Sequence, residues 1–307
     1  MQKPKLLVIL GPTASGKSDL GIRIAQDIRA EIINADSMQL YRHFDIGTAK
    51  PSIDDRNNIP HHLIDIINPE EEYNAGLFKK DADYLIEKLQ NSSINIILVG
   101  GTYLYIKVLL SGIIDGIPSD KEYRDYLRQK KTKFGNDYLH NCLNIVDPVS
   151  AARIHTNDYI RVERALEVHY LTGEKISDLQ HEHRFADNPY EYYKIGAYIE
   201  TEELKSRIEQ RVDTMISGRL VDEVLKIRKM DFKNNIKPMQ SIGYKQINDY
   251  LDELCKLEEA VEKIKMETRR LAKRQMTWLK KDKEIKWFKV DEQYDEILEG
   301  IKKFIVQ

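Results

Sequence analysis

A short segment near the N-terminus has the residues and spacing of a phosphate-binding loop. It follows the pattern G-x-x-x-x-G-K-[ST] and consists of Gly11, Pro12, Thr13, Ala14, Ser15, Gly16, Lys17 and Ser18. In such a loop, backbone N–H groups at a helix N-terminus point into one concavity and bind an anion. Lys17 would neutralise phosphate charge and Ser18 would hold Mg²⁺. The segment therefore predicts a site for a diphosphate or a nucleotide, with Mg²⁺ as cofactor.

The acid that would accompany this loop stands in an unusual place. Nucleotide-hydrolysing P-loop proteins hold magnesium with a carboxylate at the end of another apolar strand. Here the apolar run 95–99 is followed by Gly100-Gly101-Thr102, whereas the run 31–36 ends in Asp36. Both strand ends should face the phosphate loop, because ligands bind at the carboxyl ends of parallel strands. Asp36 could bind Mg²⁺, accept a proton from a nucleophile, or cap the following turn.

Apolar patterning predicts the elements that position these residues. We expect strands at 5–10, 31–36 and 95–99, with helices at 19–28 and 82–90 between them. Strands that alternate with helices indicate a parallel sheet with right-handed crossovers.

The character of the chain changes at the Gly- and Pro-bearing segment 112–120. From about 121 to 187 it is polar and helical, with a polar loop predicted at 181–183, and a strand at 193–200 and further helices follow. The predicted fold class is α/β, a P-loop NTPase-like parallel sheet core flanked by helices, with an inserted all-helical domain. We place the core at 1–115 and 190–307 and the insertion at 116–189.

Composition limits the class of protein. The 307 residues include 48 Lys and Arg against 50 Asp and Glu, so any binding of nucleic acid must come from a local patch. The two cysteines, Cys142 and Cys255, suggest neither a disulfide framework nor a zinc site. The N-terminal apolar run is five residues, shorter than a signal peptide requires, and no stretch is long enough to span a membrane. We expect a cytoplasmic protein.

The one strongly basic stretch is 263–283. It carries only two acids, Glu267 and Asp282, against Lys263, Lys265, Arg269, Arg270, Lys273, Arg274, Lys280, Lys281 and Lys283. An apolar helix face is expected from the spacing of Val261, Ile264, Leu271 and Trp278. By itself such a helix is either a solvated surface or a site for a polyanion such as RNA.

Several longer motifs resemble those of the tRNA dimethylallyltransferase (tRNA isopentenyltransferase, IPP transferase) family in its bacterial form. They are GPTASGKS (11–18), NADSMQLYRHFDIGTAKP (34–51), HHLID (61–65), VGGTYLYIKVLLSG (99–112), DYIRVERALEVHYLTG (158–173), SIGYKQ (241–246) and TRRLAKRQMTWLK (268–280). The family transfers a dimethylallyl group from dimethylallyl diphosphate to the N6 amine of the adenosine 3′-adjacent to the anticodon, in tRNAs that read codons starting with U. The resemblance implies the same reaction here.

The resemblance also implies roles for particular residues. Asp36 would be the general base, with Thr102 and Lys17 beside it, while Thr13, Thr102 and Arg211 would contact the diphosphate. An ordinary solvated helix face is the alternative for Arg211. The residues expected to contact the tRNA anticodon stem-loop are Asp36, Ser37, Met38, Gln39, Thr102, Arg124, Ile160, Arg161, Val162, Glu163, Arg164, Lys273 and Arg274. The loop after Asp36 could instead pack on itself. A monomer that does not bind membranes is expected.

Three other functions stay open at this point. A P-loop kinase for a small molecule would use the same loop but leaves the segment 34–51 unexplained. A sister enzyme that prenylates free AMP, ADP or ATP would share the core motifs, although it needs neither the insertion nor the basic helix. An RNA-binding module that uses the loop only as a phosphate anchor would not need Asp36.

Overall fold

The computed structural model describes residues 3–306 apart from 115, 184–186, 231 and 233–235. The chain divides into two compact units. The core unit comprises residues 1–110 and 189–307, and the inserted unit comprises residues 111–188. Within the described residues, no helix is both long and apolar enough to cross a bilayer.

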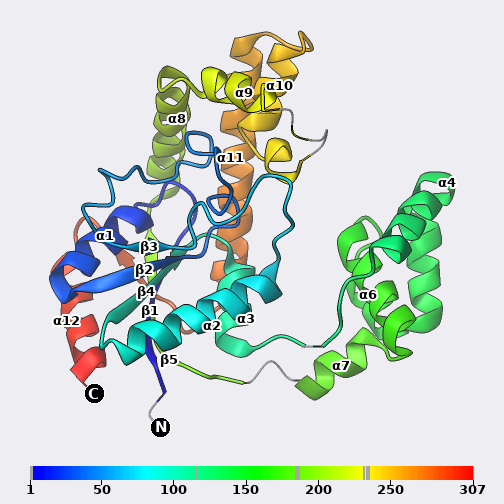
Figure 1. The fold of residues 1–307 in the computed structure, drawn as a ribbon, viewed down its shortest axis with the longest axis horizontal. Helices are drawn as coiled ribbons and strands as arrows, with labels where there is room; N and C mark the ends of the chain where they lie inside the picture. Colours follow the sequence, from blue (N-terminus) through cyan, green and yellow to red (C-terminus); the bar gives the residue numbers. More distant parts are fainter. Residues whose placement is uncertain (1–2, 115, 184–186, 231, 233–235, 307) are drawn as a thin grey trace. The chain divides into compact units, whose positions relative to one another are not determined.

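A six-stranded parallel sheet forms the centre of the core unit (Figure 1). Its strand order is β3-β2-β4-β1-β5-β6. The strands are β1 (Lys5–Leu10), β2 (Ala30–Asn34), β3 (His61–His62), β4 (Asn95–Gly100), β5 (Glu191–Tyr198) and β6 (Lys286–Lys289). The α/β fold with a parallel sheet is therefore confirmed.

Side chains of β1 alternate between two hydrophobic layers, because successive residues of a strand point to opposite faces. Leu7 and Ile9 pack with residues of α1 (Lys17–Ile28) and α12 (Tyr294–Val306). Leu6, Val8 and Leu10 belong to the other layer. That layer includes residues of α2 (Ala75–Asn91), α3 (Tyr103–Ser111) and α11 (Leu257–Leu279). Both faces of the sheet are thus covered, which fixes the strand ends that carry the site.

The remaining helices of the core unit follow β5. They are α8 (Thr201–Ser217), α9 (Leu220–Arg228), the 3₁₀ helix η1 (Lys237–Gln240) and α10 (Tyr244–Leu251). Two strands were not predicted, and both are short. β3 has two residues, and β6 has four in a region expected to be helical. Such short runs carry too little alternation to be recognised, and pairing with β2 and β5 decides them.

The described part of the inserted unit is helical, as expected. It contains α4 (Lys121–Val146), α5 (Pro148–Arg153), α6 (Tyr159–Thr172) and α7 (Ile176–His183). The polar loop predicted at 181–183 was wrong, because these residues form the last turn of α7. Asp147 ties the unit together. Its buried carboxylate accepts hydrogen bonds from the backbone N–H groups of Ser150 (2.9 Å) and Ser177 (3.0 Å), which belong to different helices.

Candidate active site

A cavity of about 480 Å³ lies where the predicted phosphate loop meets the ends of β2 and β4. Thr13, Lys17 and Ser18 contribute the loop side of its lining, and Arg211 on α8 also lines it. The segments 36–39 and 100–102 line it as well. The structure therefore brings together residues that the sequence separates by almost 200 positions. In the phosphate loop, the buried Ser15 hydroxyl has no hydrogen-bond partner among the described residues.

The ends of β2 and β4 approach each other very closely. A Cβ atom at Gly100 would lie 2.2 Å from the carbonyl oxygen of Ala35, so only glycine fits there. The Thr102 backbone N–H donates to this same oxygen at 3.1 Å. The Thr102 hydroxyl then accepts a hydrogen bond from the backbone N–H of Ser37 at 3.0 Å. Thr102 thus holds the start of the segment that follows Asp36.

The Asp36 carboxylate is half-buried and lines the cavity. One of its oxygens, Oδ1, accepts a hydrogen bond from the backbone N–H of Met38 at 2.9 Å. This bond makes Asp36 the first residue of a turn and fixes its side chain, as the capping alternative anticipated. A carboxylate has a second oxygen with its own lone pairs, so the turn does not exhaust its capacity to accept a proton.

Two cations share this cavity. Burial lowers the pKa of Lys17 to about 8, and the charge of Arg211 adds to the shift, while Asp36 and Asp19 oppose it. Burial also lowers the pKa of Arg211, against the same two carboxylates. Within the described chain, neither cation forms an ion pair, and the Lys17 ammonium donates to the Pro12 carbonyl at 3.1 Å. Two positive charges without a paired acid favour an anionic ligand.

Gln275 on α11 was not predicted, although it lies within the motif 268–280. Its Oε1 accepts from the backbone N–H of Thr13 at 2.8 Å, and its Nε2 donates to the Gly101 carbonyl at 3.1 Å. One side chain therefore joins the phosphate loop to the segment after β4. The long basic helix is in this way part of the cavity wall.

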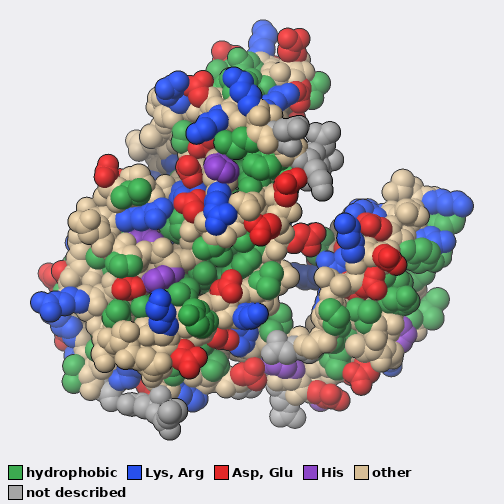
Figure 2. Space-filling model, in the orientation of Figure 1, with side chains coloured by type: hydrophobic (Ala, Val, Ile, Leu, Met, Phe, Trp, Pro, Cys, Tyr) green, Lys and Arg blue, Asp and Glu red, His purple; other side chains and the backbone are tan. Residues whose placement is uncertain are grey.

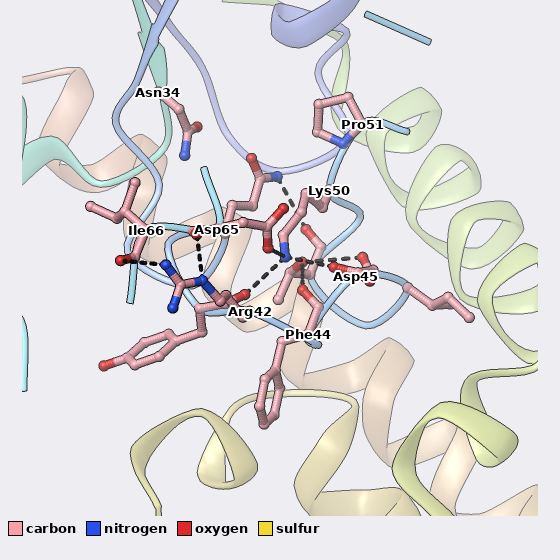
Figure 3. A network of polar contacts seen from close by, with 12 residues as sticks. Asn34, Arg42, Phe44, Asp45, Lys50, Pro51, Asp65 and Ile66 are labelled. Atoms are coloured by element: carbon pink, nitrogen blue, oxygen red, sulfur yellow. Dashed lines mark hydrogen bonds and ion pairs between the residues drawn. The ribbon is translucent and has the colours of Figure 1, made fainter. Parts of the chain in front are cut away.

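The segment after Asp36 packs on itself as well as lining the cavity. Gln39 is buried, and its amide nitrogen donates to the carbonyls of Thr48 (3.3 Å) and Ala49 (3.2 Å). The buried Lys50 ammonium lies between Asp45 (2.6 Å) and Asp65 (2.5 Å) (Figure 3). These contacts satisfy polar groups that would otherwise be buried without partners. The loop after Asp36 therefore packs on itself, as the alternative proposed, and its residues 36–39 also line the cavity.

The basic helix α11 keeps only part of its charge free. Lys265, Arg269 and Arg270 form ion pairs with carboxylates. Lys273 and Arg274 are exposed, with no ion pair to any residue that the structure describes. The predicted apolar face was wrong at Trp278, which is 45% exposed, because Leu279 turns inward instead. Figure 2 shows positive and negative side chains intermixed over the visible face of the core unit, so a polyanion would depend on such local groups.

The predicted RNA-contacting residues of the inserted unit differ in their surroundings. Arg124 and Arg164 both bind the fully buried carboxylate of Glu167, at 2.6 and 2.5 Å. Ile160 is 76% exposed, whereas Val162 belongs to the unit's hydrophobic core. Arg161 pairs with Asp158 at 3.3 Å, and Glu163 accepts from the Tyr159 hydroxyl at 2.9 Å. The three arginines predicted to contact RNA therefore already form ion pairs within the inserted unit.

Comparison with known proteins identifies the family. A family model described as IPP transferase matches residues 39–282. The chain belongs to the IPP transferase family. It is 45% identical over 302 residues to the protein named tRNA dimethylallyltransferase 2 of Geotalea uraniireducens, covering 98% of this chain and 97% of the relative. The resemblance seen in the motifs is therefore confirmed.

Solved structures of the IPP transferase family agree with this fold. The tRNA isopentenylpyrophosphate transferase of Bacillus halodurans has a TM-score of 0.72 and 38% identity, covering 99% of this chain and 96% of that one. A eukaryotic dimethylallyltransferase acting on tRNA has a TM-score of 0.79 and 32% identity, covering 90% of this chain and 69% of that one. The chain is thus an enzyme of this family, and a kinase is not supported.

Proposed function

We propose that this chain transfers a dimethylallyl group from dimethylallyl diphosphate to the exocyclic N6 amine of the adenosine 3′-adjacent to the anticodon, and releases diphosphate. The acceptors would be tRNAs that read codons starting with U. Family membership makes the chain a tRNA-modifying prenyltransferase. A single observation supports transfer from a diphosphate donor to an amine. One cavity holds Asp36 together with Lys17 and Arg211, two cations that lack an ion pair in the described chain.

The reaction needs two kinds of group, and the cavity offers both. The N6 lone pair forms the new C–N bond at the allylic carbon while the C–O bond to diphosphate breaks. Negative charge grows on the departing diphosphate, where Lys17, Arg211 and the loop N–H groups stabilise it. The amine loses its proton as it bonds to carbon, and Asp36 is the carboxylate available to accept it. Thr102 keeps Asp36 in place by holding Ser37.

The residues present fit Mg²⁺ bound together with the diphosphate. The Ser18 hydroxyl lines the cavity beside Lys17, and an oxygen donor suits this hard cation, which usually keeps few protein ligands. The described residues contain no cluster of three or more His, Cys, Asp or Glu that could hold a metal by themselves. Ser18 would therefore hold the ion jointly with substrate oxygens. When bound, Mg²⁺ would neutralise charge on the leaving diphosphate.

The target adenine is stacked within an anticodon loop, so we propose that it is extruded into the cavity. Ser37, Met38 and Gln39 would contact it from the segment after Asp36. Lys273 and Arg274 would bind RNA phosphates, and the inserted unit would supply a further RNA surface. We also infer that the enzyme acts as a monomer, because one chain supplies the phosphate loop, Asp36 and Arg211 to one cavity, and that it works in the cytoplasm with its substrate.

The test is a single-turnover transfer of labelled dimethylallyl from its diphosphate, with and without Mg²⁺. The acceptors are an unmodified anticodon stem-loop RNA and, separately, free AMP. We expect label on the RNA only and a strong dependence on Mg²⁺. Label on AMP would instead identify a nucleotide-prenylating enzyme, and label on neither acceptor would refute the proposal.

A further inference from the structure

One wall of the active-site cavity is held from outside by α9. Residues 47–49 line the cavity, whereas Glu223 is not among the lining residues. The Glu223 carboxylate accepts hydrogen bonds from three consecutive backbone N–H groups. Oε2 accepts from Asp45 at 3.2 Å and Ile46 at 2.9 Å, and Oε1 accepts from Gly47 at 3.3 Å. Successive N–H groups that converge in this way form a binding site for an anion, and here a side chain fills it.

Tyr244 at the start of α10 completes the contact. Its hydroxyl accepts from the Gly47 N–H at 3.1 Å and donates to Glu223 Oε1 at 2.5 Å. The Tyr244 side chain is fully buried, and a Cβ atom at Gly47 would lie 2.4 Å from its ring. Three segments of the chain therefore meet at one carboxylate, and the Tyr244 ring packs tightly against Gly47.

Glu223 and Tyr244 form a clamp on residues 45–47, and further hydrogen bonds connect the clamped segment to the residues after Asp36. The carbonyls of Thr48 and Ala49 directly follow the clamped N–H groups, and both accept from the Gln39 amide nitrogen. Gln39 in turn ends the segment that begins at Asp36. The position of residues 45–49 thus sets one cavity wall and the orientation of Gln39 together.

We propose that Glu223 is a positioning residue for the transfer reaction, acting through residues 45–49 on the part of the cavity that receives the acceptor base. The inference rests on the proposed function, in which residues 37–39 contact that base. Among the residues that the structure describes, every hydrogen bond of the Glu223 carboxylate goes to this wall or to Tyr244, and none goes to the phosphate loop. Loss of the clamp should therefore affect the RNA acceptor and spare the diphosphate donor.

The test compares Glu223→Gln with Asp222→Asn. Asp222 is the neighbouring acid, exposed and paired with Arg219, and serves as the matched control. We expect Glu223→Gln to lower kcat/KM for anticodon stem-loop RNA about 10-fold or more, since three N–H groups lose a charged acceptor. Donor affinity, measured with labelled dimethylallyl diphosphate, should stay within about twofold, and Asp222→Asn should match the wild type.

Tyr244→Phe is the milder second variant, because it removes one hydroxyl and keeps the packed ring. In the double variant, the fold-decrease in kcat/KM for RNA should be smaller than the product of the two single fold-decreases, because the two groups share one network. Active-site titration and thermal unfolding are measured alongside. If RNA turnover falls only in proportion to the active fraction, or if donor affinity falls equally, the positioning role is overturned. A wild-type enzyme that fails to label RNA would instead overturn the proposed function and this inference with it.

Discussion

The ionisation of Lys17 leads to a prediction about how donor binding depends on pH. The pKa of this ammonium is lowered from 10.5 to about 8, first by burial and then by Arg211. Lys17 should therefore be about 90% charged at pH 7 and about 10% charged at pH 9 in the free enzyme. If the charged form binds the diphosphate, affinity for the donor falls about tenfold per pH unit above pH 8.

Two substitutions should move this alkaline decline in opposite directions. Arg211→Gln removes a charge that lowers the pKa of Lys17, so the decline should begin at higher pH, even though overall affinity is weaker. Asp36→Asn removes a charge that raises this pKa, so the decline should begin at lower pH. The pH at which donor affinity begins to fall is measured separately from the affinity itself. Only that pH tests how the charges of Arg211 and Asp36 act on Lys17.

The assay is equilibrium binding of labelled dimethylallyl diphosphate between pH 6.5 and 10 at constant Mg²⁺. A constant wild-type affinity over this range would refute the role given to Lys17. A shift in the same direction for both variants would refute the assignment of opposing charges. The lowered pKa of Lys17 also makes the free energy of unfolding depend on pH. Between pH 8 and 10.5 the unfolded chain binds the proton that the folded chain has lost, so Lys17 contributes unfolding free energy that increases with pH.

Three further outcomes are expected. Asp36→Asn should lower single-turnover transfer by about 10²–10⁴-fold while RNA affinity persists, and near-normal transfer would exclude Asp36 as general base. Glu167→Ala should destabilise the full-length protein by about 3 kcal/mol, because two arginines lose a buried partner, whereas an unchanged thermal transition would contradict that role. RNA affinity should fall steeply with salt, and Lys273→Gln should reduce the slope by about one, a change that gel-shift titrations measure; an unaltered slope would remove Lys273 from the interface.

The phosphate loop, the parallel sheet and the family could be read from the sequence because each depends on neighbouring residues. The phosphate-loop motif is recognised from eight consecutive residues, GPTASGKS. The buried strand 5–10 is recognised from its unbroken apolar run. Asp36 and Thr102 were predicted for the same reason, since a residue that follows a parallel strand lies at a known edge of the sheet.

Tertiary packing decided which side chains complete the site. Gln275 reaches Thr13 across 262 positions, and Glu223 reaches Ile46 across 177. Nothing in the local pattern of either helix indicates such a partner, because a polar residue on a helix is ordinarily solvated. The same holds for Arg124 on α4, whose guanidinium pairs with the buried Glu167 on α6 across 43 positions. The sequence by itself determined the kind of chemistry through short local patterns, whereas the structure decided which distant polar groups hold that chemistry in place, because their hydrogen bonds form only once the sheet and helices have packed.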